Sequence, residues 1–317
     1  MVPIALLLAQ GSNRLIIGLG IGTIAVATAC KQIDDDRSPS HPFDEGTVIS
    51  DYLHTTLGRN NQPVFRLGLS ASYRPGRETV FRAVDEGVNY FFAYGFDSQM
   101  TTALREVMKT RREQVLLATG AYNYIFAHSN LRKATEKRLR QFDTEYLDVL
   151  MFLGVMKPKE FPLRVLEDMV KLREEGKARW IGISTHNRAF AGQLAREGVL
   201  DVLMIRYNAA HRGAETDIFP HLATHNPGIV SYTATRWTYL LRGGKGWPAD
   251  QPVPSAGMTY RFVLNNPAVG VTLTAPRSLA EFEENLAAVR KGPLDEEEMV
   301  FMRRFGDVVH GRKKWFM

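Results

Sequence analysis

The chain has 317 residues, of which 44% are hydrophobic and 23% are charged, as is typical of a soluble globular protein. Its net charge of +6 favours anionic partners. However, the lysines and arginines are spread over many predicted helices and no nucleic-acid-binding motif accompanies them, so we expect no nucleic-acid partner. The single cysteine, Cys30, excludes an intrachain disulfide and a cysteine-rich metal site.

Residues 15–30 are uncharged and lie between Arg14 and Lys31. As a helix they would span about 24 Å, and the flanking cations could reach the surfaces of a hydrocarbon core about 30 Å thick. One alternative is a cleaved signal peptide, because small residues before Cys30 fit a cleavage site. The other alternative is a buried helix. We predict that residues 1–31 are a membrane anchor with one transmembrane helix, which contacts the lipid bilayer through residues 15–30.

The segment after the anchor is polar. It begins near the acidic run at residues 34–36, which favours an inner-membrane protein with its N-terminus inside and its globular domain in the periplasm; a cytoplasmic domain is the alternative. Residues 32–63 are rich in Asp, Ser, Pro, His and Asn and are predicted to be a linker, with one short helix around residues 49–57.

From Phe65 onward, short apolar runs alternate with amphipathic segments. Strands are predicted at residues 66–70, 88–94, 115–121, 147–153, 179–184, 202–207, 228–233 and 269–274. Helices are predicted at residues 78–86, 101–109, 131–142, 163–175, 189–197, 279–289 and 294–309. About eight strand–helix pairs without a break in composition predict an α/β fold, a closed (β/α)8 TIM barrel over residues 64–310. Residues 311–317 form a basic tail with two aromatic residues, typical of a membrane interface, a partner contact or a solvated end.

Four segments of this region resemble the aldo-keto reductase family. They are residues 87–91 (GVNYF), 146–150 (YLDVL), 176–184 (GKARWIGIS) and 267–286, which include the EN pair near the end of that segment. The resemblance implies a TIM barrel of the aldo-keto reductase type that reduces carbonyl groups with NADPH. In that family a tyrosine donates the proton, a lysine and an aspartate lower its pKa, and a histidine orients the substrate.

This chain departs from the family pattern at three of those four places. Phe92 stands where the aspartate is expected, Gly120 where the lysine is expected, and Leu153 where the histidine is expected. Tyr94 is the candidate for the tyrosine, although the spacing before it is shortened. Each lost cationic neighbour or hydrogen-bond partner would cost about 2–4 kcal/mol of transition-state stabilisation. The resemblance therefore implies a divergent member whose catalytic tetrad is largely missing.

The residues that the resemblance assigns to the cofactor are partly retained. Ser184 would hold the nicotinamide amide and Tyr232 would stack on the nicotinamide ring. Arg277 and Ser278, with Asn285 further along the same helix, would hold the adenosine phosphate. We therefore expect either NADP or no cofactor, because the same side chains also suit the packing of a barrel.

A second group of polar residues follows three consecutive predicted strands, at residues 184–188, 206–215 and 232–237. In a barrel these strand ends meet at the C-terminal face, where active sites form. The candidates for a relocated catalytic or anion-binding site are His186, Arg206, His211 and Arg236. The alternative is a hydrogen-bonded cap in which Glu215 pairs with Arg206 or Arg212. Neither histidine has a carboxylate at ligand spacing, so no metal site is predicted.

These observations predict three alternative functions. The first is a membrane-anchored, non-catalytic pseudoenzyme that serves as an accessory or structural subunit of a larger membrane complex, photosynthetic or respiratory, with other membrane-protein subunits as partners. The second is an NAD(P)H-dependent oxidoreductase that uses the relocated polar residues. The third is a barrel that binds a nucleotide or an anion without turnover.

Overall fold

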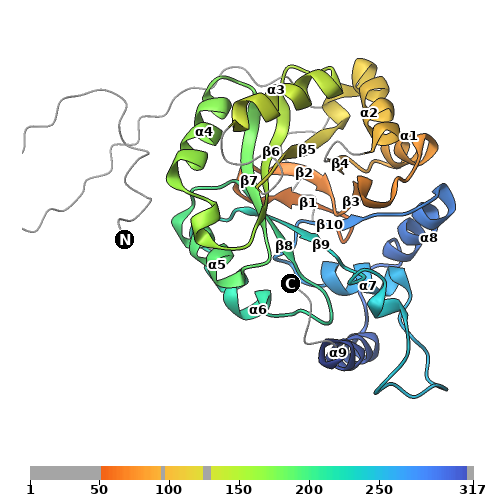
Figure 1. Cartoon of the computed structure of the whole chain (residues 1–317). Helices are drawn as coiled ribbons and strands as arrows, with labels where there is room; N and C mark the ends of the chain where they lie inside the picture. The colour runs from red at the N-terminus through yellow and green to blue at the C-terminus, as the bar shows by residue number, and fades with distance from the viewer. Residues whose placement is uncertain (1–50, 94–96, 124–129, 313–317) are drawn as a thin grey trace, which may run out of the picture. The chain divides into compact units, whose positions relative to one another are not determined.

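Eight parallel strands close into a barrel in the order β10-β3-β4-β5-β6-β7-β8-β9 (Figure 1). The computed structural model describes residues 51–93, 97–123 and 130–312. The barrel strands are β3 (Leu67–Ser70), β4 (Tyr90–Phe92), β5 (Leu116–Tyr122), β6 (Leu147–Val155), β7 (Ala178–Thr185), β8 (Val202–Arg206), β9 (Gly228–Tyr232) and β10 (Val271–Thr274). The predicted (β/α)8 barrel is confirmed, and each of these strands overlaps a strand predicted from the sequence.

Helices surround the barrel on its outer side (Figure 1). They are α1 (Arg77–Asp85), α2 (Ser98–Arg111), α3 (Leu131–Phe142), α4 (Leu163–Glu174), α5 (Arg188–Glu197), α6 (Ala214–Asp217), α7 (Ala256–Leu264), α8 (Leu279–Val289) and α9 (Glu296–Gly311). The sequence pattern does not predict α6 or α7. Helix α6 is a single turn, and α7 is buried on nearly every side, so an amphipathic period is hidden in it.

Residues 54–65 correct the prediction of a helix around residues 49–57. Strands β1 (His54–Leu57) and β2 (Gln62–Phe65) pair as an antiparallel hairpin. The turn between them contains Gly58 and Asn61, both with positive φ, which favours a tight reversal. Leu57 is fully buried in the apolar cluster inside the barrel and packs against Gly228 and Gly270. The polar composition of this segment hides a hairpin that closes the N-terminal end of the barrel.

The predicted membrane anchor, residues 1–31, and the end of the chain from residue 313 lie outside the described residues. Within the part of the chain that the structure describes, no helix is both long enough and apolar enough to cross a bilayer.

Alternate residues of the strands fill the interior of the barrel. The inward-facing residues are almost all apolar, as expected for a packed barrel rather than a pore. At the C-terminal end of this interior lie Phe92 of β4, Leu153 of β6, Met204 of β8 and Leu273 of β10. They form an apolar floor under the loops that follow the strands.

Two helix caps fix loops at this end of the barrel. The side chain of Asn187 accepts a hydrogen bond from the backbone N–H of Phe190 at the start of α5, and its amide donates to the carbonyl of Met156. The hydroxyl of Ser278 accepts from the N–H of Glu281 at the start of α8. Asn and Ser are preferred at these positions because their side chains satisfy free backbone donors. The caps therefore hold the β7–α5 and β10–α8 connections in place.

Candidate functional site

A cavity of about 580 Å³ lies at the C-terminal ends of the barrel strands and is called the barrel cavity below. Side chains at or just after the ends of all eight barrel strands line it. Its volume falls in the range of about 300–1,000 Å³ that is typical of small-molecule sites, and the C-terminal face is where (β/α)8 enzymes place their active sites. The barrel cavity is therefore the candidate site.

Two places of the family tetrad face the barrel cavity with apolar side chains. Phe92 at the end of β4 is 4% exposed and Leu153 of β6 is 1% exposed, and both line the cavity. Neither side chain has an atom that accepts or donates a hydrogen bond. The side chains at the positions expected to hold an aspartate and a histidine thus form an apolar wall of the cavity and offer no polar group to a substrate.

At the third place, β5 has no room for a side chain. Gly120 pairs with Met151 of β6, and a Cβ atom built on Gly120 would lie 1.8 Å from the Met151 carbonyl oxygen. The carbonyl of Gly120 accepts a hydrogen bond from Nε of Arg138 at 3.1 Å, which holds this stretch of β5 from the helix side. The backbone at the position expected to hold a lysine is therefore fitted to glycine.

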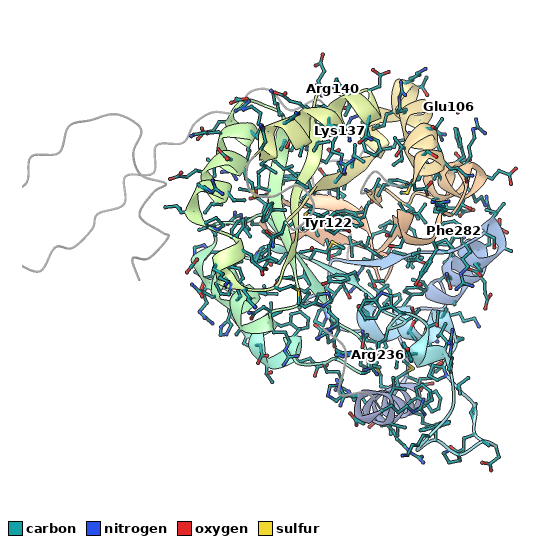
Figure 2. All side chains as sticks on the ribbon, in the orientation of Figure 1. Glu106, Tyr122, Lys137, Arg140, Arg236 and Phe282 are labelled. Atoms are coloured by element: carbon teal, nitrogen blue, oxygen red, sulfur yellow. The ribbon has the colours of Figure 1, made fainter. Side chains whose placement is uncertain are left out.

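Tyr122 follows Gly120 by two residues and lines the barrel cavity near the barrel axis (Figure 2). Tyr260 of α7 and Trp237, in the loop after β9, line it as well. Sequence reasoning missed Tyr122 and Tyr260, and it included Trp237 only as the last residue of the polar segment 232–237. A period of two along β5 places Tyr122 on the same inward face as Leu116 and Ala118, so a signal for it was present. Tyr94 lies outside the described residues, and its catalytic role stays a prediction.

Ser184 and Tyr232, predicted to hold the nicotinamide, both line the barrel cavity. Ser184 lies near the end of β7, and its Oγ accepts a hydrogen bond from the backbone N–H of Gly154 at 2.8 Å. The hydroxyl of Tyr232, at the end of β9, donates to the carbonyl of Thr185 at 3.4 Å. Within the described residues the Ser184 hydroxyl proton has no acceptor, and the Tyr232 ring lines the cavity.

The three residues predicted to hold the adenosine phosphate lie around the start of α8. Arg277 is exposed, and its guanidinium lies 5.5 Å from the centre of the Tyr73 ring, which lines the barrel cavity. Ser278 caps α8. Asn285 is buried, and its amide donates to Oγ1 of Thr274 at 3.2 Å, so it ties α8 to β10. Arg277 and Ser278 are thus placed at a rim of the site, whereas Asn285 acts in packing.

His186 lines the barrel cavity and meets the Tyr232 ring edge to face, with centroids 5.2 Å apart. Burial, with a smaller effect of the Arg206 charge, lowers the pKa of His186 to about 4, so its imidazole is neutral at pH 7. Its Nδ1 is buried and has no hydrogen-bond partner among the described residues. A buried nitrogen without a partner is costly, and a ligand group that pairs with it would remove that cost.

The other members of the predicted relocated cluster do not line the barrel cavity. His211 is 7% exposed, and its Nδ1 lies 3.2 Å from Oδ1 of Asn208. Arg236 points away toward α9, where it donates a hydrogen bond to the carbonyl of Val309 (Figure 2). Arg206 lies near enough to His186 and His211 to lower the pKa of both. The structure thus places one of the four predicted residues, His186, in the cavity and separates it from Arg236.

The predicted pairing of Glu215 with Arg206 or Arg212 is wrong. Glu215 accepts a hydrogen bond from the hydroxyl of Tyr207 at 2.7 Å and forms an ion pair with Arg303 of α9 at 3.2 Å. Arg212 pairs with Asp307 of α9 instead. The C-terminal helix, far away in sequence, supplies the partners. No group of three His, Cys, Asp or Glu side chains in the described ranges is placed to hold a metal ion.

The lowered pKa values of His186 and His211 predict a loss of stability in mild acid. Burial is the largest cause that lowers the pKa of His186 to about 4 and of His211 to about 3, with nearby arginines adding to both. An unfolded chain binds these protons near pH 6.5 but the folded chain does not, so stability is full above pH 6.5 and falls as the pH drops toward 4. Each histidine contributes a slope of up to about 1.4 kcal/mol per pH unit.

Chemical unfolding between pH 7.5 and 5 measures this slope. We expect His186→Gln and His211→Gln each to flatten it, and the double variant to flatten it most. A slope that is unchanged in the double variant would show that these histidines titrate alike in both states.

Comparison with known proteins agrees with this architecture. The model of the Aldo/keto reductase family matches residues 70–244. An L-galactose dehydrogenase of Arabidopsis thaliana is 25% identical over 281 residues, which cover 74% of this chain and 86% of the plant protein. The holo form of an aldo-keto reductase from Bacillus halodurans superposes with a TM-score of 0.66 at 19% identity, over 80% of this chain and 95% of that one.

An aldo/keto reductase from Klebsiella pneumoniae, solved in complex with NADP and acetate, has a TM-score of 0.64 at 22% identity and covers 78% of this chain and 93% of its own. Because the family model spans more than half of the chain, and because the barrel and its motifs agree with it, the chain belongs to the aldo/keto reductase family.

Proposed function

We propose that this protein is a nucleotide-binding member of the aldo/keto reductase family, which holds NADP(H) at the barrel cavity and does not reduce carbonyl groups through the family tetrad. One observation carries the proposal. The positions expected to hold the aspartate, lysine and histidine are occupied by Phe92, Gly120 and Leu153, and the backbone at Gly120 leaves no space for a replacement side chain.

Several described residues fit a nicotinamide nucleotide. Ser184 and Tyr232 line the barrel cavity, with a hydroxyl proton and a ring surface available there. The orphaned Nδ1 of His186 is a further polar anchor in the same cavity. The guanidinium of Arg277 forms no ion pair within the described ranges, although the Arg277 backbone N–H donates to the Glu281 carboxylate at 2.8 Å. Arg277 stands at the N-terminus of α8, where a phosphate is favoured. Bound NADPH would supply a hydride; relatives solved with NADP support this choice of nucleotide.

Three side chains of the same cavity are poor proton donors. Burial raises the pKa of Tyr232 and of Tyr260, so both stay protonated and are weak acids at neutral pH. His186 is neutral at pH 7, because burial lowers its pKa to about 4. A general acid works best with a pKa near the working pH. None of these three side chains meets that condition, which supports binding without tetrad-type reduction.

Titration of the full-length protein with NADPH, followed by the fluorescence of the nucleotide, tests the proposal. We expect saturable binding, weakened about tenfold by Arg277→Gln, since a charge-assisted contact to phosphate is worth about 1.4 kcal/mol or more. Ser184→Ala should also weaken it. Arg164→Gln, which removes an exposed charge on α4, serves as the matched control and should bind as the wild type does. Binding that is absent, or insensitive to both site variants, would refute the proposal.

We also propose that residues 15–30 attach the protein to the inner membrane, with the barrel on the periplasmic side as an accessory subunit beside other membrane-protein subunits. Free NADPH is absent from the periplasm, so the barrel would take up its nucleotide before export. Support comes from the sequence alone: an uncharged run between Arg14 and Lys31, followed by acidic residues. Full-length protein should stay in the membrane fraction after washing with alkali and should resist extraction by salt. Release by alkali, or accessibility of the barrel to protease from the cytoplasmic side alone, would contradict this arrangement.

A further inference from the structure

A second, smaller cavity lies between the loop after β9 and the C-terminal end of α9. Its volume is about 240 Å³. Among the residues that line it are four cationic side chains, Arg236, Arg242, Lys245 and Arg312, and we call it the cationic cavity. The remaining lining residues are a tyrosine, two glycines and a valine, and none of the described lining residues is acidic. Four positive charges around one cavity raise the local positive potential and favour the binding of an anion.

Arg312 builds one wall of the cationic cavity. Its guanidinium donates hydrogen bonds to four successive carbonyls: those of Arg242 at 3.2 Å, Gly243 at 3.1 Å, Gly244 at 3.1 Å and Lys245 at 2.7 Å. The loop is therefore folded around a fixed charge. The cavity is a defined concave site rather than a set of extended side chains in solvent.

Arg236 forms the buried end of the cationic cavity. It is 4% exposed, and it donates one hydrogen bond to the Val309 carbonyl near the end of α9. Burial and the charge of Arg312 lower its pKa, whereas Tyr239, whose ring centre lies 6.0 Å from the guanidinium carbon, acts in the opposite direction. No carboxylate acts on it in the described part of the chain. A buried arginine is usually paired with an acid. Among the described residues, Arg236 has no acidic partner.

The backbone at Arg236 is also unusual. Arg236, Trp237 and Thr238 follow one another with φ values of 48°, 50° and 70°. Left-handed backbone is costly for side chains of these types, and such strain persists where the surroundings enforce it, often at binding sites. This turn places Trp237 on the barrel cavity and Arg236 on the cationic cavity. A strained backbone conformation thus buries Arg236 beside three other cationic side chains.

We propose that the cationic cavity binds a phosphate group, either free or as part of an anionic lipid headgroup. Its volume is below that of a typical site for a whole nucleotide, so it suits a group of a few atoms. Arginine forks match the oxygens of phosphate, and Arg242 and Lys245 lie exposed at the rim without an ion-pair partner among the described residues. None of the residues that line the cationic cavity also lines the barrel cavity.

Titration calorimetry of the full-length protein with inorganic phosphate tests the proposal, using the double variant Arg242→Gln/Lys245→Gln. These side chains make no hydrogen bond within the described residues, and the carbonyls that hold Arg312 are kept, so we expect the fold and thermal midpoint to be unchanged. Phosphate affinity should fall by about tenfold or more. The control Arg164→Gln/Lys291→Gln removes the same charge from exposed positions elsewhere and should bind as the wild type does.

Flotation with vesicles separates the two sources of phosphate. We compare phosphatidylglycerol vesicles with phosphatidylcholine vesicles of equal size. If the double variant loses the preference for phosphatidylglycerol and the control keeps it, the occupant is a lipid headgroup, whether or not free phosphate also binds. If the double variant loses phosphate binding alone, the occupant is a free phosphate. If neither phosphate binding nor vesicle preference differs between the double variant and the control, the proposal is overturned.

Discussion

Replacing Gly120 by alanine should destabilise the barrel by about 3 kcal/mol or more. The added Cβ would lie 1.8 Å from the Met151 carbonyl oxygen, 2.7 Å from its carbonyl carbon and 2.9 Å from its nitrogen. All three are backbone atoms of β6, so no rotation of a side chain relieves the contact. The strands would have to move apart, and overpacking of a core without relief costs about 1–3 kcal/mol or more.

Gly311→Ala is a matched control for this substitution. A Cβ on Gly311, at the end of α9, meets no atom within 4 Å, so alanine should leave stability unchanged or raise it slightly. Gly120→Lys should be at least as destabilising as Gly120→Ala. Thermal unfolding of the variants measures the difference. If Gly120→Ala unfolds at the wild-type midpoint, β5 can hold a side chain there and the structural argument against a catalytic lysine fails.

Replacing Asp148 by alanine should cost about 3–5 kcal/mol of stability. Asp148, at the N-terminal end of β6, is fully buried and serves three donors. Its carboxylate accepts from the Leu117 backbone N–H at 2.9 Å, pairs with Arg112 at 2.9 Å and with Arg179 at 3.1 Å. Alanine would leave a buried N–H unsatisfied. Arg112 cannot swing freely into solvent, because it also donates to the carbonyls of Val115 and Tyr146.

The exposed pair of Asp85 with Arg111 provides the comparison. Its two charges lie 2.6 Å apart on the surface, and such a pair contributes about 0–1 kcal/mol. Urea unfolding of Asp148→Ala and Asp85→Ala should therefore give very different losses. Equal losses would mean that the buried carboxylate is already compensated in some other way.

The barrel strands could be predicted from the sequence because each is a short apolar run bounded by polar turns, such as residues 147–153 in β6. The β1–β2 hairpin could not, since its Thr, Gln and Asn residues resemble a linker and Leu57 is buried by contacts far away in sequence. Helix α7 could not be predicted either, because nearly all of its faces are buried and the sequence therefore shows no clear amphipathic period.

In the candidate site, too, some residues could be placed from the sequence and others could not. Ser184, Tyr232 and His186 could be placed at the cavity because strand ends of a barrel converge on one face. The direction of Arg236 could not be predicted, since it depends on three successive left-handed residues and on a carbonyl of α9. The partner of Glu215 depends on α9 in the same way. Long-range packing, rather than local pattern, decides these contacts.

The oxidation of NADPH tests most directly whether this protein binds the nucleotide without reducing carbonyl groups through the family tetrad. The protein is saturated with NADPH and supplied with a panel of aldehydes and ketones, and the oxidation is followed by absorbance. A family member with the full tetrad serves as reference. We predict carbonyl-dependent turnover at least about a thousandfold slower than the reference, because the loss of only two of the three missing tetrad partners, at about 2–4 kcal/mol each, already lowers the rate that much or more. Oxidation that saturates with the carbonyl compound, runs within about tenfold of the reference and is lost in Tyr94→Phe would contradict the account.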